Sequence, residues 1–267
     1  MKRSGPHPSS NTIDHRVITA WMKAFLEKWP RQSSAGNRWK APLLAVADPG
    51  DSLFPELRQW ASPTHAMPQD LLPGVKSVIS FFIPFDERIP RSNRGGQFSS
   101  KTWAKAYVAT NTLIAELGQF LAGNLEEAGY MAVALPPTHN YNRLTLTSDW
   151  SHKHVAYIAG LGDFGFHHLF ITDKGCCGRL GSILTTLSLE PTRRPGTPFC
   201  LYKRDGSCLE CVDHCSFGAL KSTGYDPFRC SEVCDENDRY HHDLGSTAVC
   251  GKCACVVPCS FTNPAKK

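Results

Sequence analysis

The sequence predicts a mixed chain of the α/β (α+β) class, in which a small cysteine-rich segment follows a larger domain of strands and helices. Ten of the twelve cysteines lie between Cys200 and Cys259, whereas apolar residues before position 190 recur at the spacings of helices and short strands. A stretch rich in proline, 191–198, separates these two parts. We therefore expect one domain at 1–195 and a second at 196–267.

The elements of the first domain follow from periodicity and from turn residues. Amphipathic helices are expected at 13–29, which Pro30 ends, at 52–60, at 103–128 and at 152–159, where Ser151 can act as the cap. Buried strands are expected at 42–47, 74–83, 131–135, 169–172 and 180–187. The polar stretches 86–98 and 136–147 are expected to be loops.

The cysteine spacing indicates iron–sulfur chemistry. The run Cys208-x2-Cys211-x3-Cys215 is most of the bacterial ferredoxin pattern, whose last cysteine serves the other cluster of a two-cluster fold. The pair Cys250-x2-Cys253, followed by Cys259, supplies the remainder. Two such groups within about 60 residues predict two [4Fe–4S] clusters in a ferredoxin-like segment.

Three other uses of the cysteines were weighed. A disulfide framework is typical of secreted chains, and the polar residues 1–10 do not resemble a signal peptide. Structural zinc, held by the C-x2-C pairs with His241 or His242, is the main competitor, although a C-x2-C-x3-C run is unusual for zinc. Buried unliganded thiols explain one or two cysteines rather than ten.

The net charge, the apolar runs and the cysteine content indicate which partners and which compartment to expect. The formal charge is +5, but each oxidised cluster with its four thiolates carries about −2, so two clusters leave a net charge of about +1. The basic excess is then weak evidence for a nucleic-acid partner. No apolar run approaches the length of a membrane span, and a thiol-rich chain belongs in a reducing compartment, so a cytoplasmic protein is expected.

A glycine-rich turn lies at Gly160-Leu-Gly162-Asp-Phe-Gly165 and matches the G-x-G-x-x-G dinucleotide fingerprint. The flanking segments do not fit a dinucleotide-binding site, because the segment before the turn has a helical pattern and no clear helix follows it. Glycines that permit a tight turn against a cofactor or against neighbouring backbone explain the motif better.

At 157–165, at 181–190 and in the cysteine groups, the chain resembles epoxyqueuosine reductases and, more distantly, reductive dehalogenases. The resemblance covers roughly residues 70–260 and rests mainly on the order of the motifs. It implies a nitroreductase-like domain that binds cobalamin, followed by a bacterial-ferredoxin-like domain with two [4Fe–4S] clusters that pass electrons to cobalt.

The resemblance also implies a ligand set. One cluster would use Cys208, Cys211 and Cys259, with Cys200 as the candidate fourth ligand because Asp205 stands where the family has a cysteine. The other cluster would use Cys215, Cys230, Cys250 and Cys253. Cys234 and Cys255 are then surplus, with Cys255 as a possible substitute ligand.

Asp149 falls where the family has its proton-donating aspartate, and a carboxyl desolvated by a buried cofactor stays protonated. Its alternative role is that of a cap for the following helix. The other residues expected to contact the cofactor are Arg143, Trp150, His154, Gly160, Gly162, Phe164, Gly165, His167, Cys176, Cys177 and Arg179. Cys176 and Cys177 are expected to be free thiols, because a disulfide between neighbours is strained.

These observations favour an oxidoreductase that takes electrons from a low-potential donor of the ferredoxin or flavodoxin type and reduces a small molecule through cobalamin. A transfer-RNA substrate is not expected, because Gly165-Phe-His167-His replaces the family's Gly-Lys-Asn and the family's repeat domain is missing. One alternative is an electron donor or cobalamin-reactivating partner without a metabolite substrate. Another is a cluster protein whose first domain binds flavin or no cofactor.

Overall fold

The computed structural model describes residues 12–29, 38–137 and 141–266, and its centre is a four-stranded antiparallel sheet. The strands are β1 (Leu43–Ala47), β2 (Ser77–Pro84), β8 (Gly178–Thr185) and β3 (Ala132–Leu135), in that order across the sheet. All three pairings are antiparallel, so α+β is the more accurate of the two predicted descriptions.

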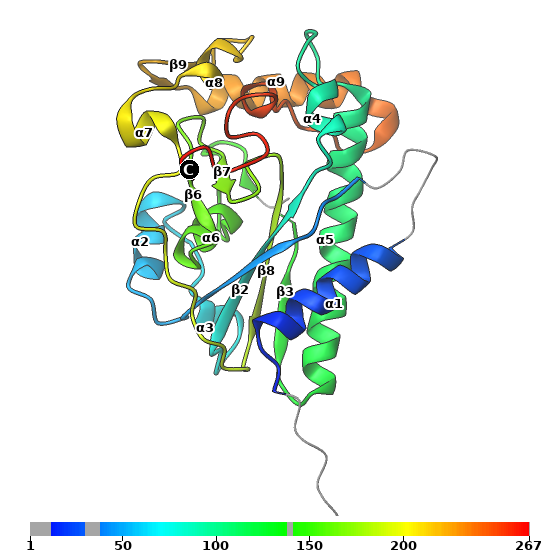
Figure 1. The fold of residues 1–267 in the computed structure, drawn as a ribbon, viewed down its shortest axis with the longest axis vertical. Helices are drawn as coiled ribbons and strands as arrows, with labels where there is room; N and C mark the ends of the chain where they lie inside the picture. Colours follow the sequence, from blue (N-terminus) through cyan, green and yellow to red (C-terminus); the bar gives the residue numbers. More distant parts are fainter. Residues whose placement is uncertain (1–11, 30–37, 138–140, 267) are drawn as a thin grey trace, which may run out of the picture.

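Helices cover both faces of the sheet and make three layers (Figure 1). On one face lie α1 (His15–Lys28) and the long α5 (Lys101–Glu127), and on the other lie α2 (Leu53–Trp60) and α6 (His152–Ile158). Side chains of β2 alternate between the two layers: Val78 and Phe82 pack with α2 and α6, whereas Ile79 and Phe81 pack with α1 and α5. This is the period of two expected of a strand.

The sequence patterns placed the longer helices and strands of this part correctly, but they missed short elements in two predicted loops, in the glycine turn and at α3. The stretch 86–98 contains a short helix, α4 (Arg88–Ser92), after which Asn93 is fully buried. The stretch 136–147, of which 138–140 lie outside the described residues, contains a small hairpin of β4 (Tyr141–Asn142) and β5 (Thr147–Ser148). The turn that contains Gly162 leads into a second hairpin, β6 (Gly162–Phe164) with β7 (Phe170–Thr172). The remaining short helix is α3 (Pro68–Leu71).

The cysteine-rich segment lies across one end of these layers, at the top of Figure 1. It consists of α7 (Leu201–Asp205), α8 (Glu210–Asp213), β9 (Leu220–Lys221), β10 (Gly224–Tyr225), α9 (Pro227–Tyr240) and two 3₁₀ turns at His242–Leu244 and Lys252–Ala254. A third apolar cluster joins it to the rest, because Phe85 and Trp103 pack with Phe199, Ala254 and Cys255. The boundary at residue 195 remains a prediction.

Within the described ranges, no helix is both long and apolar enough to cross a bilayer.

Candidate metal centre

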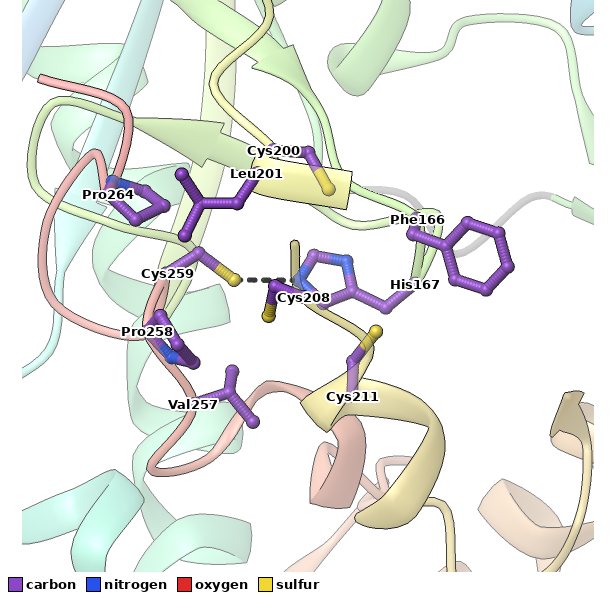
Figure 2. A pocket seen from close by; sticks show the side chains of 10 residues that line it. All are labelled: Phe166, His167, Cys200, Leu201, Cys208, Cys211, Val257, Pro258, Cys259 and Pro264. Atoms are coloured by element: carbon purple, nitrogen blue, oxygen red, sulfur yellow. Dashed lines mark hydrogen bonds between the residues drawn. The ribbon is translucent and has the colours of Figure 1, made fainter. Parts of the chain in front are cut away.

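Four cysteines from three separate segments converge on one pocket (Figure 2). Cys200 precedes α7, Cys208 and Cys211 flank the start of α8, and Cys259 follows the second 3₁₀ turn. The other residues around the pocket are Phe166, His167, Leu201, Val257, Pro258 and Pro264. The structure thus brings the predicted fourth ligand, Cys200, together with the three cysteines of its group.

The electrostatics of this pocket favour a cation. Burial, together with the negative charge of Cys259, Cys200 and Cys208, raises the pKa of Cys211 to about 12. Burial is also the main reason that the pKa of Cys208 is raised. Thiols that resist ionisation next to one another release their protons when a metal binds all of them. Four convergent thiols with apolar neighbours match the ligand set of a [4Fe–4S] cluster.

Cys259 has further neighbours on the side of the larger layers. His167 Nε2 lies 3.3 Å from Cys259 Sγ, and the ligand atoms of His167, Cys176 and Cys259 all lie within 4.8 Å of one another. A hydrogen bond with Cys176 raises the pKa of Cys259. The Cys176 backbone N–H also donates to the Cys259 carbonyl at 2.9 Å, which fixes the position of this cysteine.

A second group of thiols lies around α9. Burial and the charges of Cys250, Cys230 and Cys215 raise the pKa of Cys253, so the other three predicted ligands lie within electrostatic range of this thiol. Cys234, one helical turn after Cys230, belongs to the same group: its hydrogen bond is the largest cause that lowers the pKa of Cys230 to about 6. The second group therefore contains five thiols, one more than the four predicted ligands.

The remaining cysteines are buried in the third apolar cluster rather than in either group. Cys177 is 2% exposed and its thiol donates to the Ala254 carbonyl at 3.2 Å. Cys255 is fully buried, and Asn93 Nδ2 donates to its sulfur at 3.4 Å and to the Cys250 carbonyl at 2.9 Å. Asn93 was not predicted as a partner of the cysteines, because only the fold brings α4 to the cysteine-rich segment.

Lys252, between Cys250 and Cys253, is 2% exposed. Its ammonium donates to the backbone carbonyl of Asn93 at 3.0 Å and to that of Gly95. A buried cation held by neutral carbonyls needs negative charge nearby, and the thiols Cys250 and Cys255 are the groups whose charge acts on Lys252. Its position inside a C-x2-C pair was the signal that sequence reasoning overlooked.

Asp149 does not have the environment predicted for a protonated carboxyl. It lies at the surface, and it accepts hydrogen bonds from Thr64 Oγ1 at 2.6 Å and from Ser62 Oγ at 3.0 Å. These two bonds, with Thr64 the larger effect, lower its pKa. It does not cap α6 either, since Ser151 holds the N-cap position, and the Ser151 hydroxyl bonds His154 Nδ1 instead of the helix backbone.

The glycine turn packs against protein. A Cβ on Gly160 would lie 2.9 Å from the Arg193 carbonyl oxygen, one on Gly162 would lie 2.0 Å from the Ile171 carbonyl oxygen, and one on Gly165 would meet the His167 ring. The close approach that these glycines permit is therefore to neighbouring chain. A contact of Gly160, Gly162 or Gly165 with a cofactor stays a prediction.

The other predicted cofactor contacts also have protein partners. Trp150 Nε1 donates to Ser182 Oγ at 2.9 Å, and burial lowers the pKa of His154 to about 4 next to the Phe164 ring. The Arg179 guanidinium donates to Asn111 Oδ1 at 2.7 Å and lies over the Tyr107 ring. Arg143 lies exposed in the β4–β5 hairpin.

These contacts are a test of the corrinoid prediction. A tetrapyrrole needs a cradle of small residues and polar groups that face open space. The glycines, Trp150 and Arg179 face other protein groups instead, so the residues chosen from the sequence do not form that cradle.

Comparison with known proteins finds similarity to reductases. It is 26% identical to an epoxyqueuosine reductase from Bacillus cereus over 205 residues, which cover 72% of this chain and 50% of the relative. An epoxyqueuosine reductase from Bacillus subtilis is 27% identical over 210 residues, with 72% and 49% covered. The chain thus spans about half the length of the curated relatives it matches. No family model matches it.

Solved structures share the fold. A selenomethionine-labelled epoxyqueuosine reductase superposes with a TM-score of 0.60 at 19% identity, covering 92% of this chain and 65% of that one. A reductive dehalogenase whose structure suggests a mechanism for B12-dependent dehalogenation superposes with a TM-score of 0.51 at 16% identity, covering 79% and 28%. The chain is distantly homologous to the first family and structurally similar to the second.

Proposed function

From this distant homology to epoxyqueuosine reductases, we propose that the chain is a two-cluster iron–sulfur oxidoreductase. Electrons from a low-potential donor of the ferredoxin or flavodoxin type pass through two [4Fe–4S] clusters and reduce a small molecule. The observation that carries the proposal is the convergence of Cys200, Cys208, Cys211 and Cys259 on one pocket.

The second group supports the same reading. Cys215, Cys250 and Cys253 with Cys230 supply four sulfurs, and Cys234 is a fifth thiol next to them. The Leu220 N–H donates to Cys215 Sγ at 3.2 Å, which is the kind of contact that stabilises a cluster thiolate. Cys211 of the first group is buried and the other thiols of both groups are partly buried; the polarity around a cluster sets the potential at which it accepts electrons.

Cobalamin is the acceptor that the resemblance implies, and we retain it as a component of the proposal to be tested by cobalt analysis. Cobalamin supplies a metal centre that accepts low-potential electrons. Because the residues predicted to contact cobalamin do not form a cradle for this cofactor, we propose no reaction step on it.

A second function is favoured by the contacts at the glycine turn. If the α+β part holds no large cofactor, the chain is an electron donor or cobalamin-reactivating partner for another protein. The packing of Gly160 and Gly162 against backbone supports this alternative.

Metal analysis of anaerobically purified protein, from cells supplied with iron and cobalamin, separates these functions. We expect about eight iron per chain and an EPR signal after dithionite reduction, as two [4Fe–4S] clusters require. One cobalt per chain in addition supports the corrinoid reductase. Eight iron with no cobalt, and no corrinoid bound on incubation, leaves the electron carrier. Zinc in place of iron refutes the proposal.

A further inference from the structure

We propose that His167 tunes the first cluster by donating a hydrogen bond from Nε2 to the sulfur of Cys259. His167 is then a positioning residue that raises the reduction potential of this cluster. The inference rests on the proposed function, because it requires a [4Fe–4S] cluster on Cys200, Cys208, Cys211 and Cys259. It replaces the role in binding a cofactor that the sequence suggested for His167.

The hydrogen bonds of the ring determine where its proton lies. The Leu169 backbone N–H donates to His167 Nδ1 at 3.1 Å, so Nδ1 is an acceptor. In a neutral imidazole the other nitrogen then carries the hydrogen. That nitrogen, Nε2, is 3.3 Å from Cys259 Sγ, within hydrogen-bonding distance of a sulfur acceptor.

The β6–β7 turn is built to hold this ring. His167 is 4% exposed, and the ring occupies the space next to Gly165, where a Cβ would lie 2.4 Å from its Cε1. The Gly165 N–H donates to the Leu169 carbonyl at 2.8 Å, which closes the turn. A side chain at position 165 would therefore displace the ring from its place beside Cys259.

Backbone hydrogen bonds also hold the position of Cys259, whose sulfur is the acceptor. The backbone N–H groups of Cys176 and Cys177 donate to the carbonyls of Cys259 and Ser260 at 2.9 and 3.1 Å. Donor and acceptor thus belong to two segments, 92 residues apart, that backbone hydrogen bonds hold in place. Figure 2 shows the ring directed across the pocket at the Cys259 sulfur.

A hydrogen bond to a ligand sulfur changes the potential of a cluster. Reduction adds negative charge, part of which lies on the thiolates, so an N–H donor stabilises the reduced state more than the oxidised one. The potential of the first cluster is raised as a result. Backbone groups contact sulfurs of both groups, Leu220 at Cys215 and Glu210 at Cys208, so His167 adds a side-chain donor to the first group.

The experiment compares two variants of the anaerobically purified, full-length protein. His167→Phe keeps a ring and removes the donor, whereas His167→Gln places an amide N–H close to the position of Nε2. His242→Phe is the matched control, because His242 is exposed and bonds only the Arg239 carbonyl among the contacts described. Iron content, an EPR-monitored redox titration and proton ENDOR of the reduced protein are measured on each.

We expect His167→Phe to retain about eight iron, to shift one of two midpoint potentials downward and to lose one exchangeable proton coupling. His167→Gln should restore most of the potential and the coupling, and His242→Phe should match the wild type. Unchanged potentials in an iron-replete His167→Phe protein overturn the inference and leave the proposed function intact. Loss of half the iron in His167→Phe also overturns it, because the histidine is then needed to hold the cluster. A wild-type protein without iron refutes the proposed function itself.

Discussion

Replacing Cys200 by alanine is the sharpest test of the first group of thiols. This cysteine lies outside the spacing of the ferredoxin run, and it was assigned only because Asp205 stands at the usual position. In the structure it is one of four cysteines around the pocket. Three sulfurs leave one iron of a cubic cluster without a protein ligand, and we expect the whole cluster to be lost.

The expected magnitude follows from the division into two groups. The second group shares no cysteine with the first, so Cys200→Ala should lower the iron content from about eight to about four per chain. Cys211→Ala provides the reference for a complete loss of this cluster. Iron is determined on anaerobic protein, together with the size of the EPR signal after reduction.

Cys176→Ala is the matched control. Cys176 is buried and lies next to Cys259 and His167, but it does not line the pocket. We expect this variant to keep about eight iron. If Cys200→Ala keeps all its iron while Cys176→Ala loses half, Cys176 is the fourth ligand and the reasoning from the pocket is wrong.

Three further predictions concern stability. Burial lowers the pKa of His152 from 6.5 to about 4 in the folded protein. Protonation of this histidine therefore favours the unfolded chain, so its contribution to folding stability is complete above pH 6.5 and is lost as the pH falls toward 4. The free energy of unfolding, measured with urea, should be about 2 kcal/mol lower at pH 5 than at pH 7.5 because of His152. The difference between the two pH values should be smaller in the His152→Asn variant. Gly162→Ala drives a Cβ into the Ile171 carbonyl and should cost about 3 kcal/mol, seen as a lower melting temperature; an unchanged value contradicts the β6–β7 geometry. Lys252→Met leaves two carbonyls without their donor and should cost about 2 kcal/mol, whereas Lys101→Met, at an exposed ion pair, should cost less than about 1 kcal/mol.

Periodicity was sufficient to locate the regular elements of the larger part. The strand around Ile79 and the long helix that begins near Trp103 were predicted correctly, because continuous apolar runs and glycine or proline boundaries are local signals. The short helix at Arg88–Ser92 was missed, since five residues are too few to show a helical period. Strand order also cannot be read from local patterns, because β8 pairs with β2 across about 100 residues of chain.

The part of the candidate site that depends on the spacing of cysteines along the chain was predictable from the sequence. Cys208, Cys211 and Cys215 stand close together because a short turn holds them. The roles of His167 and Cys176 depend instead on where β6–β7 meets Cys259, a contact between distant segments. The glycine turn was predicted to approach a cofactor or neighbouring backbone, and it approaches backbone; that the Arg193 and Ile171 carbonyls are the groups concerned depends on contacts between distant segments.

The shared apolar cluster has a consequence for how the protein is made in the cell. Cys253 completes the second group of thiols and Cys259 completes the first, so the second proposed cluster cannot be inserted before the ribosome has passed Cys253, nor the first before it has passed Cys259. Until then Phe85 and Trp103 lack their partners Ala254 and Cys255. Iron shortage should therefore appear first as a folding defect of newly made chains, which proteases remove, rather than as an accumulation of stable protein without clusters.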